Sequence, residues 1–361
     1  MSRFKKLFGI GLVLTMALTA CNDVNGPDGD GFDVMASAED LQAVGAAFET
    51  DVYRSLAAMG RDFSASAAPG YASELVETSW ELISPDMPGR MQVAAQRMAD
   101  LLNAGSAAVV LIPESFRGRT YEHDPLEGYF HNPERAGAPE NGIRFILYEV
   151  NPITGEPGAT EIGFVDVTDE STATAAIARL RVVSEEIEYV NYTVTATGVL
   201  NSISVNIAGY VTDGTTRVDL DLTNSIDATF ATARLEVDYI IEVVARDFRL
   251  SANVVIEIDG ETEQVTLTLD AEFQQGNNNV MIDGTIDGDA GTGTVEFFVN
   301  GALFATITLE PTSITVVGPD GETLSAEHAR AVGQIIEALE KVLDDTFENF
   351  FSPVEWLFDL S

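Results

Sequence analysis

The sequence has very little cysteine, histidine and lysine. It contains one cysteine, Cys21, and three histidines in 361 residues. A single cysteine excludes an internal disulfide framework and a zinc site built from cysteines, and three histidines leave little material for histidine-based chemistry. Lysine and arginine together number 19, against 58 aspartates and glutamates, so the formal net charge at pH 7 is -39. This charge argues against binding to nucleic acid or to an anionic membrane surface, because phosphate recognition needs clustered cations.

The motifs of common enzymes are absent as well. The chain has no G-x-S-x-G, no H-E-x-x-H, no phosphate-binding P-loop and no dinucleotide-binding glycine fingerprint. We therefore expect no catalytic residues, no enzymatic activity and no cofactor. Hydrophobic residues nevertheless make up 45% of the chain, so a large folded core is expected rather than disorder.

The N-terminus has the pattern of a secretory signal. Three cations, Arg3, Lys5 and Lys6, precede an apolar run over 7–20 that is too short to span a membrane. The run ends in Leu18-Thr19-Ala20-Cys21, which resembles the lipobox of bacterial lipoproteins. The resemblance implies that 1–20 is a removed signal peptide, that Cys21 carries the lipid, and that the protein is anchored in the bacterial cell envelope. The alternative is an ordinary signal peptide with an incidental cysteine.

The same resemblance bears on which membrane holds the anchor. In that family, an aspartate directly after the lipidated cysteine favours retention in the inner membrane. Asn22 stands at that position here, so the outer membrane is favoured over the inner one. Residues 21–36 are rich in glycine and aspartate and predict a flexible tether between the anchor and the folded part, because they have almost nothing to bury.

Helical patterns flank the chain's middle part. Ser37 is a candidate N-cap, and apolar residues at every third or fourth position predict a helix over 38–59, followed by a loop over 60–72. A second helix is expected after Pro88-Gly89, within an N-terminal helical part that covers 37–117. Ser325 is the candidate cap of a C-terminal helix over 325–351, whose acidic side faces away from a long apolar stripe.

From about residue 118 the hydrophobic period changes to two. Alternation of apolar and polar residues is clear in 263–273 and 235–245, and it is typical of strands with one buried and one wet face. Three dipeptides, Asp213-Gly214, Asp259-Gly260 and Asn300-Gly301, separate strand-like runs and predict tight hairpin turns. About a dozen strands are expected between 118 and 318.

These patterns predict a single α+β domain over 37–361. Its centre is a large curved antiparallel sheet, a meander that closes as far as a half-barrel or a partly open barrel. Amphipathic helices from the N- and C-terminal parts are expected to cover its apolar face, because an apolar sheet face must be buried.

Weak metal-site candidates occur at two places. His123 and His131 would be neighbours if 125–128 is a turn, and Glu122 or Asp124 could then complete a zinc site. The alternative is that both histidines are ordinary polar surface residues of a hairpin without a metal. Calcium is the other candidate metal, at the acidic residues Asp283, Asp287 and Asp289. The twelve-residue calcium-loop pattern fails there, and the alternative is a strand-end turn.

The segment 137–148 (GAPENGIRFILY) resembles uncharacterised bacterial lipoproteins, which implies no activity. Two hypotheses for the function remain. The first is a non-enzymatic, lipid-anchored envelope protein that binds an apolar ligand, a lipid or acyl chain, between sheet and helices. The second is a structural or interaction lipoprotein with a solid core, which serves as a scaffold or docking partner. No ligand-binding residue can be named from the sequence.

Overall fold

The computed structural model describes most of the central part of the chain. The described residues are 44, 50–67, 110–126, 128–199, 201–229, 231–262, 264–325, 328–330, 332–336 and 339. The predicted signal peptide, Cys21, the tether, the helix after Pro88-Gly89 and most of the C-terminal helix lie outside these residues.

The described part contains one long helix and fifteen strands. The helix is α3 (Asp51–Ala67), and a short 3-10 helix, η2 (Val244–Arg246), joins two strands. The strands are β1 (Arg119–Asp124), β2 (Gly128–His131), β3 (Gly142–Val150), β4 (Pro157–Asp169), β5 (Ala176–Ser184), β6 (Ile187–Val199), β7 (Ser202–Thr212), β8 (Arg217–Ala228), β9 (Thr232–Val243), β10 (Phe248–Asp259), β11 (Gln264–Gln275), β12 (Asn278–Asp287), β13 (Thr292–Val299), β14 (Ala302–Glu310) and β15 (Ser313–Val317).

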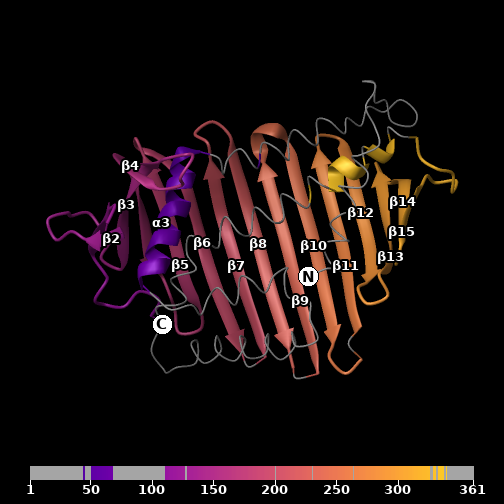
Figure 1. The fold of residues 1–361 in the computed structure, drawn as a ribbon, viewed down its shortest axis with the longest axis horizontal. Coiled ribbons are helices and arrows are strands. Elements are labelled where there is room, and N and C mark those ends of the chain that lie inside the picture. The colour runs from indigo at the N-terminus through magenta and orange to yellow at the C-terminus, as the bar shows by residue number, and fades with distance from the viewer. Residues whose placement is uncertain are drawn as a thin grey trace.

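All fifteen strands form one open sheet (Figure 1). From β3 to β15 each strand is hydrogen-bonded to its neighbours in sequence, always antiparallel. At the other end, β1 pairs in parallel with β3 and antiparallel with β2, so the sheet as a whole is mixed. The expected antiparallel meander is thus confirmed. The α+β description needs correction, because the described residues are mostly β with few helices.

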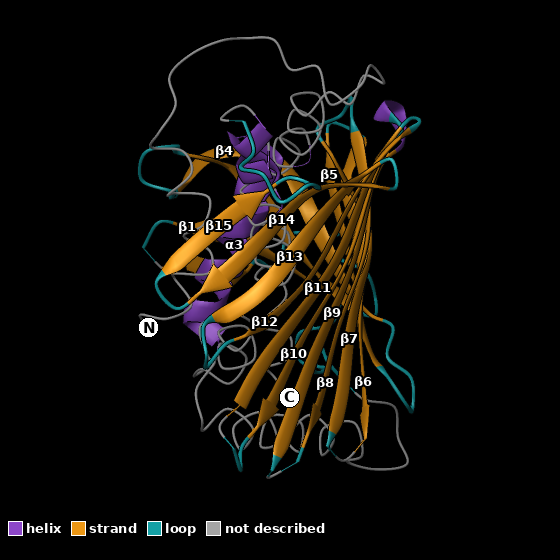
Figure 2. Ribbon diagram, turned by 90° about the vertical axis from the view of Figure 1, so that its right-hand side faces the viewer, coloured by secondary structure: helices purple, strands orange, loops and turns teal. Residues whose placement is uncertain are grey.

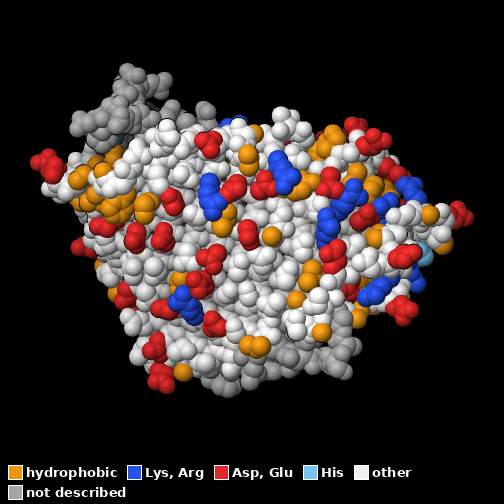
Figure 3. All heavy atoms as spheres, turned by 180° about the vertical axis from the view of Figure 1, so that it is seen from behind, with side chains coloured by type: hydrophobic (Ala, Val, Ile, Leu, Met, Phe, Trp, Pro, Cys, Tyr) orange, Lys and Arg blue, Asp and Glu red, His pale blue; other side chains and the backbone are white. Residues whose placement is uncertain are grey.

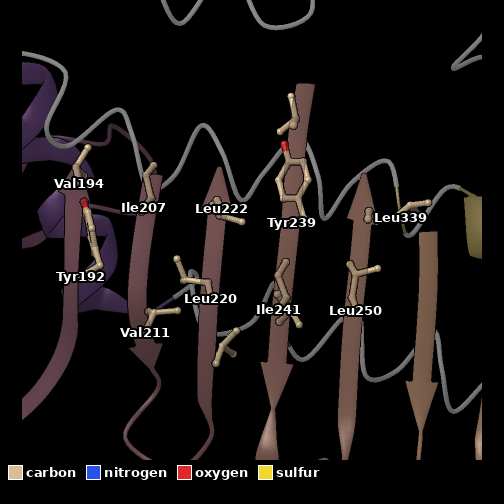
Figure 4. Close-up of a cluster of buried hydrophobic side chains, with 14 of the residues drawn as sticks. Tyr192, Val194, Ile207, Val211, Leu220, Leu222, Tyr239, Ile241, Leu250 and Leu339 are labelled. Atoms are coloured by element: carbon tan, nitrogen blue, oxygen red, sulfur yellow. The ribbon is translucent and has the colours of Figure 1, made fainter. Parts of the chain in front are cut away.

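The alternating pattern gives the sheet two chemically different faces. On the apolar face, Leu220, Ile241, Leu250 and Phe273 stand side by side across β8 to β11, and all four are buried. Figure 4 shows such side chains rising from one side of the neighbouring strands, and Figure 2 shows how the strands fan out as the sheet twists. Strand twist of this kind follows from backbone sterics.

Helix α3 packs on the apolar face near one end of the sheet. Its N-terminus is capped by Thr50, whose Oγ1 accepts a hydrogen bond from the Tyr53 backbone N–H at 3.1 Å. Leu56 is fully buried, and the Ser55 hydroxyl oxygen accepts a hydrogen bond from the Tyr148 N–H of β3 at 3.0 Å. The predicted loop at 60–72 is wrong for 60–67, which continue the helix. One glycine costs only about 1 kcal/mol in a helix, and the alanines after it are good helix formers.

Part of the C-terminal helix is described. Residues 328–330, 332–336 and 339 are helical, and the Ser325 hydroxyl accepts a hydrogen bond from the His328 N–H at 3.2 Å, as a cap does. Val332, Ile335 and Leu339 are buried in the same hydrophobic cluster as the side chains of the sheet. In this segment the apolar stripe therefore points at the sheet.

Raising the sodium chloride concentration from 0.1 to 1 M is expected to raise the melting temperature. The net charge of -39 makes the folded chain repel itself. The Debye length falls from ~10 Å to ~3 Å over this range, and exposed ion pairs, which salt weakens, contribute only about 0–1 kcal/mol each. Thermal melts followed by circular dichroism measure the shift. A melting temperature that stays constant or falls would contradict the expectation.

Candidate functional site

The polar face of the sheet is the candidate functional surface (Figure 3). Hydrogen-bonding side chains lie in register across seven strands there: Asn206, Thr223, Asp238, Asn253, Asp270, Asp283 and Glu296. Within this row the Asn206 amide donates to the Thr223 hydroxyl at 3.0 Å, and the Asn253 amide donates to the Asp238 carboxylate at 2.7 Å. The sheet therefore presents an ordered array of hydrogen-bonding groups to solvent.

The arginines of this face, among the described residues, are spread over β3 to β10. Arg144 of β3 forms a two-pronged ion pair with Asp166 of β4, with both N–O distances 2.7 Å. Its guanidinium also lies 3.7 Å from the centre of the Phe164 ring. Two-pronged pairs hold both side chains in one geometry, so this end of the face is ordered.

Glu188 of β6 is the centre of a larger network. Its carboxylate accepts hydrogen bonds from the Tyr210 hydroxyl at 2.6 Å, from the Asn191 amide at 2.7 Å and from Arg181. Burial alone would raise the pKa of Glu188, but these three donors together with the charge of Arg181 outweigh it and lower the pKa to about 2. Burial and the nearby Glu188 carboxylate raise the pKa of Tyr210 to about 12. Arg217 then stacks on the Tyr210 ring, 3.8 Å from its centre.

Glu188→Gln is expected to lower the free energy of unfolding at pH 7 by about 1–2 kcal/mol. The folded-state pKa of about 2 lies below the ordinary value of 4.5. The stabilisation by the carboxylate is therefore complete above pH 4.5 and is lost as the pH falls towards 2. Urea melts of both proteins at pH 7 and at pH 3 should show a smaller difference at pH 3. Glu149→Gln, at an exposed position, is the control. A difference that does not depend on pH would argue against the network.

The strands β11 to β15 have a different character. The chain has no lysine or arginine between Arg249 and Arg330. Three carboxylate residues, Asp270, Asp283 and Glu296, are direct neighbours across β11, β12 and β13. In Figure 3 blue side chains lie over the centre and right of the face, whereas the left-hand end shows orange and red ones. This end is thus acidic without cations of its own.

The two candidate histidines lie on one hairpin, as expected, and the register makes them diagonal neighbours on one side of it rather than a directly opposite pair. His123 stands opposite Tyr129, and His131 stands opposite Tyr121. The ring centres of these pairs are 5.3 and 5.8 Å apart. Glu122, a candidate partner for zinc, is instead paired with Arg135 at 3.0 Å.

The three candidate calcium ligands are separated. Asp283 is the β12 member of the acidic row, Asp287 is the last residue of β12, and Asp289 belongs to the turn between β12 and β13. Asp287 accepts a hydrogen bond from the Asp289 N–H at 3.0 Å, and Asp289 accepts one from the Val265 N–H at 3.1 Å. Within the described part of the chain, no group of three histidine, cysteine, aspartate or glutamate residues is placed to hold a metal ion.

Two shallow depressions are lined by described residues at the ends of strands. The larger, about 590 Å³, lies at the ends of β8 to β11, and its lining includes Arg234, Glu257 and Asp259. The smaller, about 390 Å³, is lined by Thr174, Thr197 and neighbouring residues. Most of the lining residues of both are polar, and the lining of the larger one also includes Ala228, Ala233 and Ile258, which are buried.

Comparisons with protein-family models, with curated proteins and with solved structures found no match. None of the helices in the described ranges combines the length and the apolar character needed to cross a membrane.

Proposed function

We propose that this chain is a non-enzymatic, lipid-anchored protein of the bacterial cell envelope that serves as a scaffold or docking partner. The observation that supports this most is the polar face of the sheet. It is broad, its side chains are held in rows by hydrogen bonds and ion pairs, and the depressions beside it are shallow. Broad ordered surfaces of this kind suit contact with another macromolecule better than capture of a small molecule.

The anchor is the lipid on Cys21, with the outer membrane as the favoured site. The tether of residues 21–36 can span at most about 55 Å when fully extended. The folded domain would therefore stay within a short distance of the membrane while remaining free to turn.

Cys21→Ser is expected to abolish lipid attachment, because the serine hydroxyl does not replace the thiol in thioether formation. Bacteria grown with radioactive palmitate should label the natural chain and not the variant. Asn22→Ser, at the next position, is the matched control and should keep the label. Full labelling of Cys21→Ser would refute the anchor.

A second candidate is the binding of an apolar ligand, a lipid or acyl chain, between the sheet and helices. It is supported by the long apolar face and by the helical residues packed on it. In this version the sheet is a half-barrel covered by N- and C-terminal helices. The described core residues are tightly buried, which favours a solid core.

Native mass spectrometry of the protein taken from its own membrane separates the two candidates. The scaffold proposal expects the mass of the chain with its covalent lipid alone. One further lipid bound per chain would overturn it in favour of a carrier.

A further inference from the structure

A small apolar patch interrupts the polar face at its acidic end. Met281 of β12, Phe298 of β13 and Leu303 of β14 stand side by side in register, and we call these three residues the distal patch. Met281 is 40% exposed, and the other two are half-buried. Figure 3 shows orange side chains gathered at this end of the face. Solvent-facing apolar side chains in a group often mark a contact surface.

Carboxylates border the distal patch. Glu272 of β11 is the direct neighbour of Met281, and Asp283 and Glu296 face each other two residues further along the strands. With no lysine or arginine between Arg249 and Arg330 in the sequence, these strands offer the patch no positive charge of their own. The surface thus combines apolar contact area with uncompensated negative charge.

The combination of apolar contact area and negative charge determines which kind of partner can bind to the distal patch. A second copy of the chain would bring the same acidic strands against the first, and an anionic membrane would repel them too. A segment with apolar side chains flanked by lysine or arginine complements both features. We propose that the distal patch docks a basic, apolar segment of a partner protein. The proposal rests on the docking function proposed above and assigns that function to one end of the face.

The test measures the affinity of a defined probe for the full chain in nanodiscs of neutral phosphatidylcholine. The probe is a fluorescent peptide of alternating lysine and leucine, and its binding is followed by anisotropy. Met281→Ser with Phe298→Ser, and separately Asp283→Asn with Glu296→Gln, should each weaken binding about tenfold. The matched controls lie elsewhere on the same face. Ile240→Ser removes an apolar side chain, and Asp221→Asn with Asp227→Asn, at two exposed positions of β8, removes the same charge; each should change the affinity less than about twofold.

Other outcomes contradict the proposal in distinct ways. Equal weakening by the two charge-removing pairs would mean that overall charge alone attracts the peptide. Equal binding of a glutamate–leucine peptide would remove the charge argument. A dimer that is lost on Met281→Ser with Phe298→Ser would assign the patch to a second copy, and binding to anionic vesicles would assign it to a membrane. Each of these results would overturn the distal patch as a docking site for a basic segment. The scaffold proposal is tested separately, by whether native mass spectrometry finds a further lipid bound to the chain. Circular dichroism melts show that each variant is folded.

Discussion

Gly209→Ala is expected to lower the free energy of unfolding by about 3 kcal/mol or more, one of the largest effects of any single methyl group in this chain. Gly209 lies in the middle of β7, opposite Tyr192 of β6, with a φ of +155°. An added Cβ would stand 2.2 Å from the Asn191 carbonyl oxygen and 2.4 Å from the Tyr192 Cα. Both are backbone atoms of the neighbouring strand, so the two strands would have to separate.

Urea melts of the natural chain and the variant measure this loss. Gly318→Ala is the matched control, because its Cβ would be 3.4 Å from the Leu324 side chain, an ordinary contact distance. Shortening the opposing side chain by Tyr192→Ala should not rescue Gly209→Ala, since the closest atoms belong to the backbone. Rescue, or a loss as small as that of the control, would show that β6 and β7 can move apart at little cost.

Asp169→Ala is expected to lower the free energy of unfolding by about 3 kcal/mol. The Asp169 side chain at the end of β4 is only 3% exposed. One of its oxygens accepts hydrogen bonds from the backbone N–H groups of Leu111 and Ile112 at 3.0 and 3.2 Å and from the Arg117 guanidinium at 3.0 Å. Without the carboxylate, two amides and an arginine lose their acceptor, and the segment 110–118 is no longer fastened to the sheet.

Hydrogen exchange gives the sharper measurement for this site. In Asp169→Asn, which keeps the shape and removes the charge, the amides of Leu111 and Ile112 should exchange faster than in the natural chain. Asp213→Ala is the control, because Asp213 accepts two backbone N–H bonds in an exposed turn and its loss should cost within about 1 kcal/mol. Unchanged protection of both amides in Asp169→Asn would mean that another group holds the segment.

The strands could be predicted because their alternation is a local property of the sequence. Asn300-Gly301 turns with both residues at positive φ, as a two-residue hairpin requires. The turn between β5 and β6 has the same geometry at Glu185 and Glu186, with φ of 49° and 69°. Two glutamates give no turn signal, which is one reason why about a dozen strands were expected instead of fifteen. The parallel pairing of β1 with β3 was not predicted either, because it depends on which edge of the β1–β2 hairpin the chain returns to.

The distal patch could not be predicted from the sequence, for a specific reason. Simple alternation through Ala305, Ile307 and Leu309, which are all buried, places Leu303 on the apolar face as well. The register shifts at this point, so that Phe297 pairs with Ala305 and Phe298 pairs with Leu303. The extra residue moves Leu303 to the polar face. The acidic character of the strands around the patch could be predicted, because the sequence has a long stretch without lysine or arginine.

The strict order of strands from β3 to β15 makes this sheet nearly one-dimensional. From β4 onwards each strand exchanges backbone hydrogen bonds only with the strands before and after it in sequence, so stability is approximately a sum of single-strand and nearest-neighbour contributions, as in repeat proteins. Folding can then spread from any hairpin by short loop closures, which favours a faster rate than the long-range pairings of a sandwich. Evolution can also lengthen or shorten such a sheet two strands at a time. Every later strand would keep its direction, and both faces would keep their chemistry.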